Sequence, residues 1–196
     1  MQLSDIATVR SGLVLSRKQA RNTFGVRYPL LNLRSINPKG VIDMDKIDVF
    51  DAVESLSEDY LSQVSDIIVR LSDPYTAVLI DEKTMGMVIS SNFVIIRCDN
   101  MAILPEYLHW LINSPKMKKS IYVNSTSNML GSINAKYFSE YKLDSLAVAD
   151  QRRIAAMNSL ALKESNLLFQ LSLEKERYYK LLIQNTYEEM KRGNYA

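Results

Sequence analysis

Residues 150–192 form an unbroken run of 43 residues that contains neither proline nor glycine. Proline and glycine are the residues most disfavoured in a helix interior, Asp150 is a good N-cap, and Gly193 stands where a helix would end. The run therefore predicts one continuous helix of about 64 Å. A domain of 150 residues is only about 30 Å across, so this helix is longer than its own domain requires.

Apolar residues follow the predicted helix in two stripes. The first has the alternating three-and-four spacing of a coiled coil and is interrupted by Glu164 and Lys175. Two stripes indicate two packing partners, and the chain holds no second long helix, so we expect the first stripe to pair with a helix of another molecule. The first stripe comprises Ile154, Met157, Ala161, Leu168, Leu171, Tyr178 and Leu182, and the second Leu162, Phe169, Leu173, Ile183 and Tyr187.

The first 149 residues have a different pattern, in which short β-rich runs alternate with turn signals. Pro105 stands at the first position of an apolar segment with helical spacing that stops before Ser114 and Pro115. We therefore predict an α+β protein, with a mixed-sheet domain over residues 1–149 followed by a long coiled-coil-forming helix over residues 150–192. The strand-like runs cover residues 28–33, 64–71, 75–80 and 87–97.

Composition excludes several classes of protein. With 196 residues, 47% of them apolar and 23% charged, the chain can bury a real core and is not a disordered or fibrous sequence. A single cysteine, Cys98, excludes an internal disulfide framework, and no cysteine and histidine spacing fits a zinc site. We find neither a secretory signal pattern nor an apolar run long enough to span a membrane, and expect a cytoplasmic protein.

Charge is distributed unevenly along the chain. Residues 1–40 carry seven Lys and Arg against one Asp, whereas residues 41–66 carry eight acidic residues against one Lys. The net charge of +2 therefore conceals a basic segment next to an acidic one. This pattern predicts a polarised surface that leaves room for a polyanionic partner.

No convincing catalytic constellation emerges from the sequence. His109 is the only histidine and lies in the apolar helical segment, where a packing role is favoured over general-base chemistry. Asp66, Asp73 and the triplet at residues 81–83 loosely imitate a metal-dependent nuclease, and residues 72–75 echo the Asp-Pro-Pro-Tyr motif of amino-methyltransferases without its second proline. The glycines are scattered, so no glycine-rich loop is present for a methyl donor or a phosphate. We predict no catalytic residue, metal or cofactor.

Groups that recognise nucleic acid are more abundant. Arginines and amide side chains are interleaved between residues 10 and 37, and such side chains pair with phosphates and base edges. Residues 124–136 are polar, neutral and rich in Asn and Ser, with Lys116, Lys118 and Lys119 just before them. We expect residues 124–136 to form a long functional loop.

The order of these segments resembles the specificity subunit of type I restriction–modification systems over nearly the whole chain. Such a subunit carries two target recognition domains joined by two long helices, whereas this chain has one of each. It therefore resembles a half-subunit, or one half of a longer protein. The resemblance rests on residues 3–12, 28–36, 40–42, 64–69, 87–97, 105–108 and 124–134, and on residues 148–155 at the start of the long helix.

This resemblance implies a double-stranded-DNA reader without catalysis of its own. Two copies, or two different half-subunits, would pair through antiparallel helices whose length sets the gap between two half-sites. Methylation subunits would dock on the helices and the adjoining domain, and the restriction subunit would join through them. The candidate DNA contacts in the matching regions are Arg17, Lys18, Arg21, Arg34, Ser91, Asn92, Asn124, Ser125, Thr126, Asn128 and Lys136.

A second interpretation belongs to a different class of protein. The long helix together with the acidic segment at residues 43–66 would also suit an assembly module whose domain binds protein. Salt dependence of DNA binding separates the two interpretations, because a DNA reader loses affinity steeply as salt rises. An enzyme is the third interpretation, and methyl transfer by the isolated chain would support it.

Overall fold

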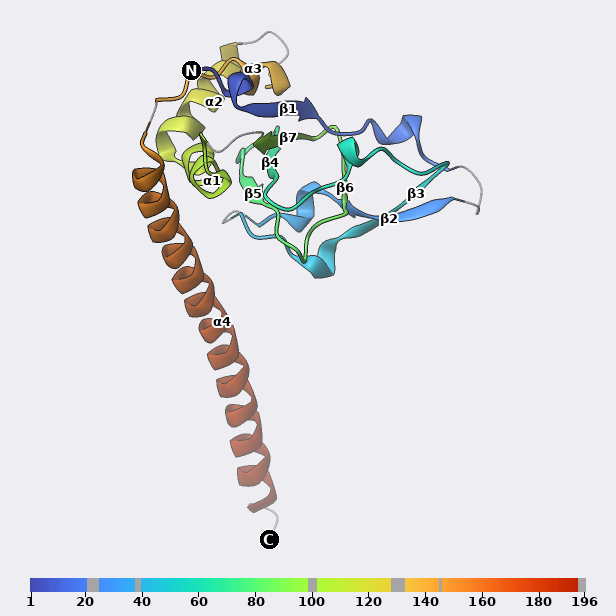
Figure 1. The fold of residues 1–196 in the computed structure, drawn as a ribbon. Helices are drawn as coiled ribbons and strands as arrows, with labels where there is room; N and C mark the ends of the chain where they lie inside the picture. The colour runs from blue at the N-terminus through green and yellow to red at the C-terminus, as the bar shows by residue number, and fades with distance from the viewer. Residues whose placement is uncertain (21–24, 38–39, 99–101, 128–132, 145, 194–196) are drawn as a thin grey trace. The chain divides into compact units, whose positions relative to one another are not determined.

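A computed structural model describes residues 1–20, 25–37, 40–98, 102–127, 133–144 and 146–193, with the backbone alone for Thr126 and Ser127 (Figure 1). The chain divides into two compact units, Met1–Ile154 and Ala155–Ala196. No helix within the described ranges combines the length and the apolar character needed to cross a bilayer.

The first unit contains two small sheets. The four-stranded sheet is antiparallel throughout, with the order β1 (Ala7–Ser11), β7 (Phe93–Cys98), β4 (Ile67–Arg70), β5 (Ala77–Leu79). The three-stranded sheet has the order β3 (Asp48–Ala52), β2 (Val26–Leu31), β6 (Val88–Ile89), and β2 runs antiparallel to β3 but parallel to β6.

The predicted α+β class with a mixed sheet is confirmed, and the strands divide between two sheets, of which the smaller is mixed. The run at residues 87–97, which reads as one β-rich segment, forms two strands that belong to different sheets. A turn at Ser90–Asn92 separates them, with the amide of Phe93 donating to the carbonyl of Ser90 at 3.0 Å. Period-two alternation describes each strand but not the change of sheet at this turn.

The core lies where the two sheets meet. β4 and β7 are the central strands of the larger sheet, and Ile67, Ile68, Ile95 and Ile96 are all fully buried. Such continuous apolar runs are expected for strands covered on both faces. The cluster that unites the two sheets contains Leu31, Ile36, Ile68, Val78, Ile80, Met87, Ile89, Phe93 and Ile95.

Within the described residues, three helices and five short 3-10 turns complete the first unit, together with the first turns of the C-terminal helix. α1 (Pro105–Asn113) packs against β4 and β5, and α3 (Ala135–Ser139) packs against β1. α2 (Pro115–Ser127) follows α1 directly. The 3-10 turns are η1 (Leu3–Asp5), η2 (Leu15–Arg17), η3 (Leu33–Ser35), η4 (Met44–Lys46) and η5 (Glu58–Tyr60).

Polar side chains fasten α1 to the sheet. The Nε2–H of His109 donates to the carbonyl of Ala77 at 3.1 Å, and Asn113 both donates to that carbonyl at 2.9 Å and accepts from the Ala77 amide at 3.0 Å. Burial lowers the pKa of His109, which keeps the ring neutral at pH 7. The structural role predicted for the histidine is confirmed by these contacts.

A buried ion pair joins β4 to β7. Asp66 is fully buried, and its two carboxylate oxygens each accept from Arg97, Oδ1 from Nε and Oδ2 from Nη2, both at 2.7 Å. Asp66 Oδ2 also accepts from the amide of Gln63 at 2.8 Å. The pair thus has the bidentate geometry that favours arginine over lysine.

α4 (Val148–Gly193) is one continuous helix of 46 residues, which confirms the predicted long helix and extends slightly beyond the predicted residues 150–192 at both ends. Its first turns belong to the first unit, because Gln151 is only 3% exposed and bonds backbone groups before α1. Gln151 Oε1 accepts from the Leu104 amide at 2.9 Å, and Nε2 donates to the carbonyls of Ala102 at 2.9 Å and Leu146 at 3.0 Å. One side chain therefore fixes the start of α4 to the N-terminus of α1.

Replacing Gln151 with alanine is expected to lower the free energy of unfolding by about 2 kcal/mol, since it removes three hydrogen bonds made by a buried side chain. Denaturant unfolding of the full chain measures this change. Arg152→Ala, at the neighbouring exposed position, is the control and should change the free energy by less than about 0.5 kcal/mol. Equal effects of the two substitutions would contradict the anchoring role of Gln151.

Candidate nucleic-acid interface

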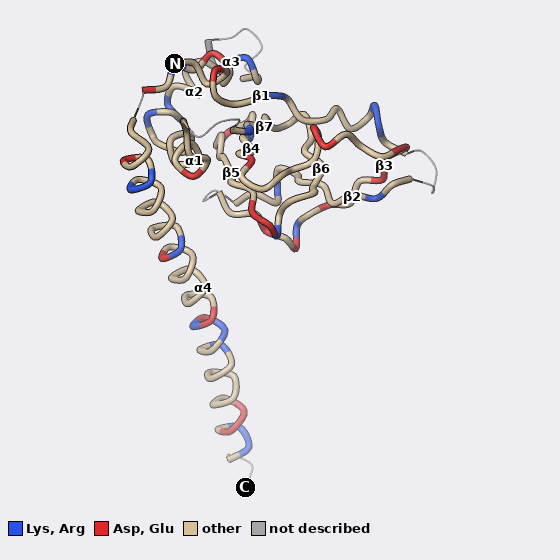
Figure 2. The backbone as a smooth tube through the Cα atoms, in the orientation of Figure 1, with Lys and Arg blue, Asp and Glu red and all other residues tan. Residues whose placement is uncertain are grey.

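The basic and acidic segments of the sequence pair with each other. Antiparallel pairing of β2 with β3 brings the two segments side by side, and Figure 2 shows blue and red positions close together on these strands. The predicted polarised surface is therefore wrong for these residues, because most of the described basic side chains are matched by carboxylates. The ion pairs are Arg10–Asp59, Lys18–Glu54, Arg27–Asp51 and Arg34–Asp48.

Two of the predicted DNA contacts, Lys18 and Arg34, belong to these pairs. The hydrogen bond from Lys18 raises its own pKa and lowers that of the Glu54 carboxyl. Arg34 contacts Asp48, which also accepts from the Asn32 side chain at 2.7 Å. Both basic groups are exposed enough to meet a phosphate, but each would have to share its charge with a carboxylate.

Arg17 stands apart from this set. It ends η2, it is exposed, and the described residues include no carboxylate within ion-pair distance of it. Its amide donates to the carbonyl of Val14 at 3.0 Å. Arg21, predicted alongside it, lies outside the described residues.

Ser91 and Asn92 occupy the turn between β6 and β7 and are both exposed. The turn is held on both sides by backbone bonds: the Ser91 amide donates to Leu13 at 2.8 Å, and the Leu71 amide donates to Asn92 at 3.0 Å. Gly12 passes so close that a Cβ there would lie 2.2 Å from the Ser90 carbonyl oxygen. Two polar side chains are thus presented on a rigid backbone, which suits specific recognition.

The same turn borders an open depression of about 520 Å³. Its walls come from five separated segments of the first unit. The polar groups on them can donate and accept hydrogen bonds, as base edges and sugar-phosphate oxygens require. Besides Ser91 and Asn92, the lining residues are Ser11, Gly12, Val14, Leu33, Leu71, Ser72, Ile133 and Asn134.

Arg70 is a candidate that the sequence did not single out. Its Nε donates to Ser72 Oγ at 2.9 Å and its Nη1 to the carbonyl of Leu33 at 3.4 Å, and both of these residues line the depression. The half-buried guanidinium therefore lies at the edge of the depression. An arginine at the end of a strand carries no local pattern, so only the fold reveals this position.

The expected loop at residues 124–136 is wrong at both ends. Residues 124–127 continue α2, and Asn134 caps α3 by accepting from the Tyr137 amide at 3.3 Å. Helix α2 buries Met117, Ile121 and Ser125 at four-residue spacing, so its buried face continues into this stretch. Asn128, together with residues 129–132, lies outside the described residues.

The predicted DNA contacts within this segment differ in exposure. Ser125 is 2% exposed and accepts from the Tyr75 hydroxyl at 2.9 Å, so in this structure it packs inside the domain and cannot meet a base edge. Asn124 is exposed and donates to the Ser120 carbonyl at 2.8 Å. Lys136 is exposed and lies 3.6 Å from Glu140. The side chain of Thr126 is not among those described.

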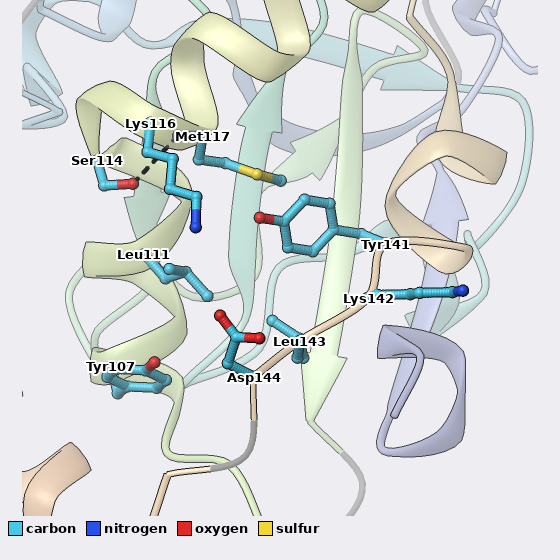
Figure 3. Close-up of a pocket in the computed structure, with 9 residues that line it drawn as sticks. All are labelled: Tyr107, Leu111, Ser114, Lys116, Met117, Tyr141, Lys142, Leu143 and Asp144. Atoms are coloured by element: carbon cyan, nitrogen blue, oxygen red, sulfur yellow. Dashed lines mark hydrogen bonds between the residues drawn. The ribbon is translucent and has the colours of Figure 1, made fainter.

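The three lysines of α2 occupy different environments. Lys118 is half-buried, and burial lowers its pKa, whereas Lys119 is exposed. Lys116 lines a second, small cavity of about 40 Å³, and Figure 3 shows its amino group directed toward the same space as Tyr141 and Asp144. That volume holds one or two waters and no base, so the cavity is not a nucleotide pocket.

Two of the carboxylates that imitate a nuclease, Asp66 and Asp81, have structural roles. Asp66 pairs with Arg97, and the Asp81 carboxylate accepts from Thr84 Oγ1 at 2.7 Å and from the Lys83 amide at 3.1 Å. The hydrogen bond from Thr84 leads the causes that lower the pKa of Asp81. Within the described residues, no group of three or more His, Cys, Asp or Glu side chains could hold a metal ion.

The geometry thus defines a small α+β domain with a rigid polar turn beside an open depression, followed by a long helix. Solved structures with this fold include a chain from a study of complex assembly and conformational transition of the type I R-M system, with a TM-score of 0.61 and 16% identity over 97% of this chain and 48% of that one. The HsdS subunit from Thermoanaerobacter tengcongensis has a TM-score of 0.57 with 13% identity, and the type I S subunit from M. genitalium a TM-score of 0.50 with 13% identity.

These similarities establish a shared fold with type I specificity subunits. The last two comparisons each cover 84% of this chain and 39% of the other, so the present chain spans half or less of the length of the structures it matches. No protein-family model and no curated protein sequence matches the chain.

Proposed function

We propose that this chain is the DNA-recognition half-subunit of a type I restriction–modification complex and has no catalytic site of its own. The observation that carries the proposal is the match over 97% of the chain to one half of a type I R-M chain, which includes both the domain and the long helix. The first unit would read duplex DNA, and the helix would pair with a second half-subunit.

The proposed reading surface is the depression bordered by the turn at Ser91 and Asn92. Asn92 would contact a base edge, because an amide can both donate and accept in the major groove. Arg17 and Arg70 would bind phosphates and fix the register on the duplex. The paired residues Lys18 and Arg34, with Asn124 and Lys136, would contribute weaker backbone contacts.

Pairing of two copies would give the complex two recognition domains. Two-fold symmetry of the pair predicts a bipartite, two-fold symmetric target, and the helix length sets the separation of its halves. The second apolar stripe of α4, which includes Leu162, Phe169 and Ile183, would remain for the methylation subunits. Those subunits would supply the methyl donor and bring the restriction subunit to the complex.

Fluorescence anisotropy with a labelled random-sequence duplex tests DNA binding by the purified full chain. We expect log K to fall linearly with log salt, with a slope of about −2 to −5 for two domains that each contact a few phosphates. An assembly module whose domain binds protein would show no increase of anisotropy with concentration and no such dependence on salt. A chain that fails to bind duplex DNA at about 50 mM salt would contradict the proposal.

Asn92→Ala is expected to weaken binding to the preferred sequence by about 5- to 150-fold, the effect of losing one specific base contact. Arg17→Ala should instead weaken binding to all sequences alike and reduce the salt slope. Asn166→Ala, on the exposed surface of α4, is the matched control for the loss of an amide. An Asn92 variant that keeps full sequence preference would remove the turn from the proposed surface.

A further inference from the structure

The first apolar stripe of α4 is exposed in the single chain. The exposed fractions are 72% for Met157, 60% for Leu168, 52% for Leu171 and 60% for Tyr178. These side chains lie on one helix at coiled-coil spacing, with Ile154, Ala161, Leu168 and Leu182 as one row and Met157, Leu171 and Tyr178 as the other. Covering such a water-exposed apolar row with a second helix lowers the free energy, because apolar surface is removed from water.

Two charged residues interrupt the rows. Glu164 stands in the row of Met157 and Leu171, and Lys175 stands in the row of Leu168 and Leu182. Both side chains are exposed, and among the described residues neither has an ion-pair partner within 4.0 Å. A charge inside an apolar seam lowers the stability of the pair unless the partner helix presents the opposite charge.

An antiparallel partner with the same sequence can meet this requirement. In such a pair, a residue of one row lies level with a residue of the other row on the partner helix. Because the two helices run in opposite directions, the numbers of two facing residues add up to the same sum all along the seam. A sum of about 339 places Glu164 level with Lys175 of the second copy, and Lys175 level with its Glu164. The same sum faces Leu168 with Leu171, Met157 with Leu182, and the small Ala161 with the large Tyr178.

Two flanking pairs agree with this register, whereas a third sets Leu167 beside Glu174 of the second copy. Beside the seam, Leu160 lies next to Leu181 of the second copy, and Arg153 next to Glu188. Leu160 and Leu181 are 68% and 60% exposed in the single chain, so this contact also covers apolar surface. Ile154 faces Asn185 at the end of the seam, where the match is poorest.

Other arrangements of two identical helices set these charges against apolar residues or against like charges. Shifting the antiparallel register by one heptad sets Glu164 against Leu168 or Leu182, and Lys175 against Met157 or Leu171. An in-register parallel pair faces Glu164 with Glu164 and Lys175 with Lys175, which repel. A single arrangement therefore satisfies the charges and the apolar residues together.

We propose that Glu164 and Lys175 form two reciprocal ion pairs between copies of this chain and select a symmetric antiparallel dimer centred between residues 169 and 170. The proposal rests on the pairing of half-subunits proposed above and specifies the partner as a second copy. The central Leu168 and Leu171 layers supply the apolar contact, and the flanking ion pairs fix orientation and register. A charge pair at a seam thus selects the correct partner, as polar seam residues do in other coiled coils.

Charge reversal in the full chain tests this proposal. Glu164→Lys and Lys175→Glu should each weaken self-association by about tenfold or more, because both facing pairs become repulsive. An equimolar mixture of the two variants should return to wild-type association, since every facing pair is then of opposite sign. The double variant should also recover the dimer. Sedimentation velocity across a concentration series measures each association constant.

Two control variants separate the effect of the seam charges from that of other charges on α4. Glu176→Lys and Lys180→Glu make the same chemical changes at exposed positions of α4 away from the seam and should leave association unchanged. A wild-type chain that is monomeric would overturn the pairing in the proposed function, and the register with it. A wild-type dimer that neither reversal weakens, or whose reversed variants fail to recover on mixing, would overturn the register and leave the pairing intact.

A distance measurement tests the register without altering the seam. A spin label at position 180, introduced by Lys180→Cys in a Cys98→Ser background, should lie about 32 Å along the helix axis from its counterpart in the dimer. Sliding the helices by one heptad would move this axial distance by about 10 Å, and a parallel pair would bring the labels level with each other. Either of these distances would overturn the proposed register.

Discussion

A chain that ends at Ile154 is expected to be a monomer and to bind a bipartite duplex about 100- to 10,000-fold more weakly than the full chain. The truncation removes the second compact unit, including most of the apolar stripe that we propose to pair. It keeps Gln151 and its bonds to Ala102, Leu104 and Leu146, so the first unit retains its own contacts. Binding at two half-sites gains affinity through high effective concentration, and a single domain loses that gain.

Light scattering measures the mass, and anisotropy measures the affinity for the duplex. A full-length variant carrying Leu168→Asp and Leu171→Asp should behave like the truncated chain, whereas Phe169→Asp on the second stripe should remain dimeric. These variants separate loss of pairing from loss of chain length. A truncated chain that stays dimeric, or that keeps full affinity for the bipartite duplex, would show that α4 does not join the two recognition domains.

Replacing Arg97 with methionine is expected to lower the free energy of unfolding by about 3–5 kcal/mol at pH 7. Asp66 is fully buried, and Arg97 donates to both of its oxygens at 2.7 Å, so the substitution leaves a buried carboxylate without its counter-charge. The pair also joins the residue directly before β4 to β7, and these are the two central strands of the larger sheet. Denaturant unfolding monitored by circular dichroism measures the loss.

The matched control is Arg27→Met, which makes the same chemical change at an exposed ion pair. The side chains of Arg27 and Asp51 are 75% and 47% exposed, so solvent screens their interaction, and we expect a change below about 1 kcal/mol. Similar losses at positions 27 and 97 would contradict the importance of burial. Adding Asp66→Asn to the Arg97→Met variant should recover part of the lost stability, because it removes the uncompensated charge.

The long helix could be predicted because its evidence is local. Absence of proline and glycine over residues 150–192, with Asp150 and Gly193 at the ends, indicates its extent to within a few residues of the observed Val148–Gly193. The short helix at Pro105–Asn113 was predicted for the same reason. In both cases the residues that determine the element lie within it.

The division of the strands between two sheets could not be predicted, since it depends on distant parts of the chain. The turn at Ser90–Asn92 is held by Leu13 and Leu71, and the backbone at Gly12 approaches it too closely for any larger residue. Nothing within residues 87–97 indicates these contacts. The pairing of basic with acidic residues likewise follows from the β2–β3 pairing and not from the charge runs themselves.

The candidate site was predicted in part. Ser91 and Asn92 were chosen from the sequence, and the structure places both on the border of the depression, although their role in DNA binding remains a prediction. Ser125 was chosen from the same kind of polar pattern, but its partner Tyr75 lies 50 residues away and buries it. Arg70 was missed because its position beside Ser72 and Leu33 arises only in the folded domain.

Selection of duplexes from a random-sequence library by the purified full chain tests the central claim most directly. We predict that the enriched sequences contain two half-sites in inverted orientation at one fixed spacing, because a symmetric antiparallel dimer presents two identical recognition domains. The spacing should be lost, and the affinity should fall, for the chain that ends at Ile154. Absence of any enriched sequence, or enrichment of a single undivided site, would contradict a bipartite DNA-recognition function.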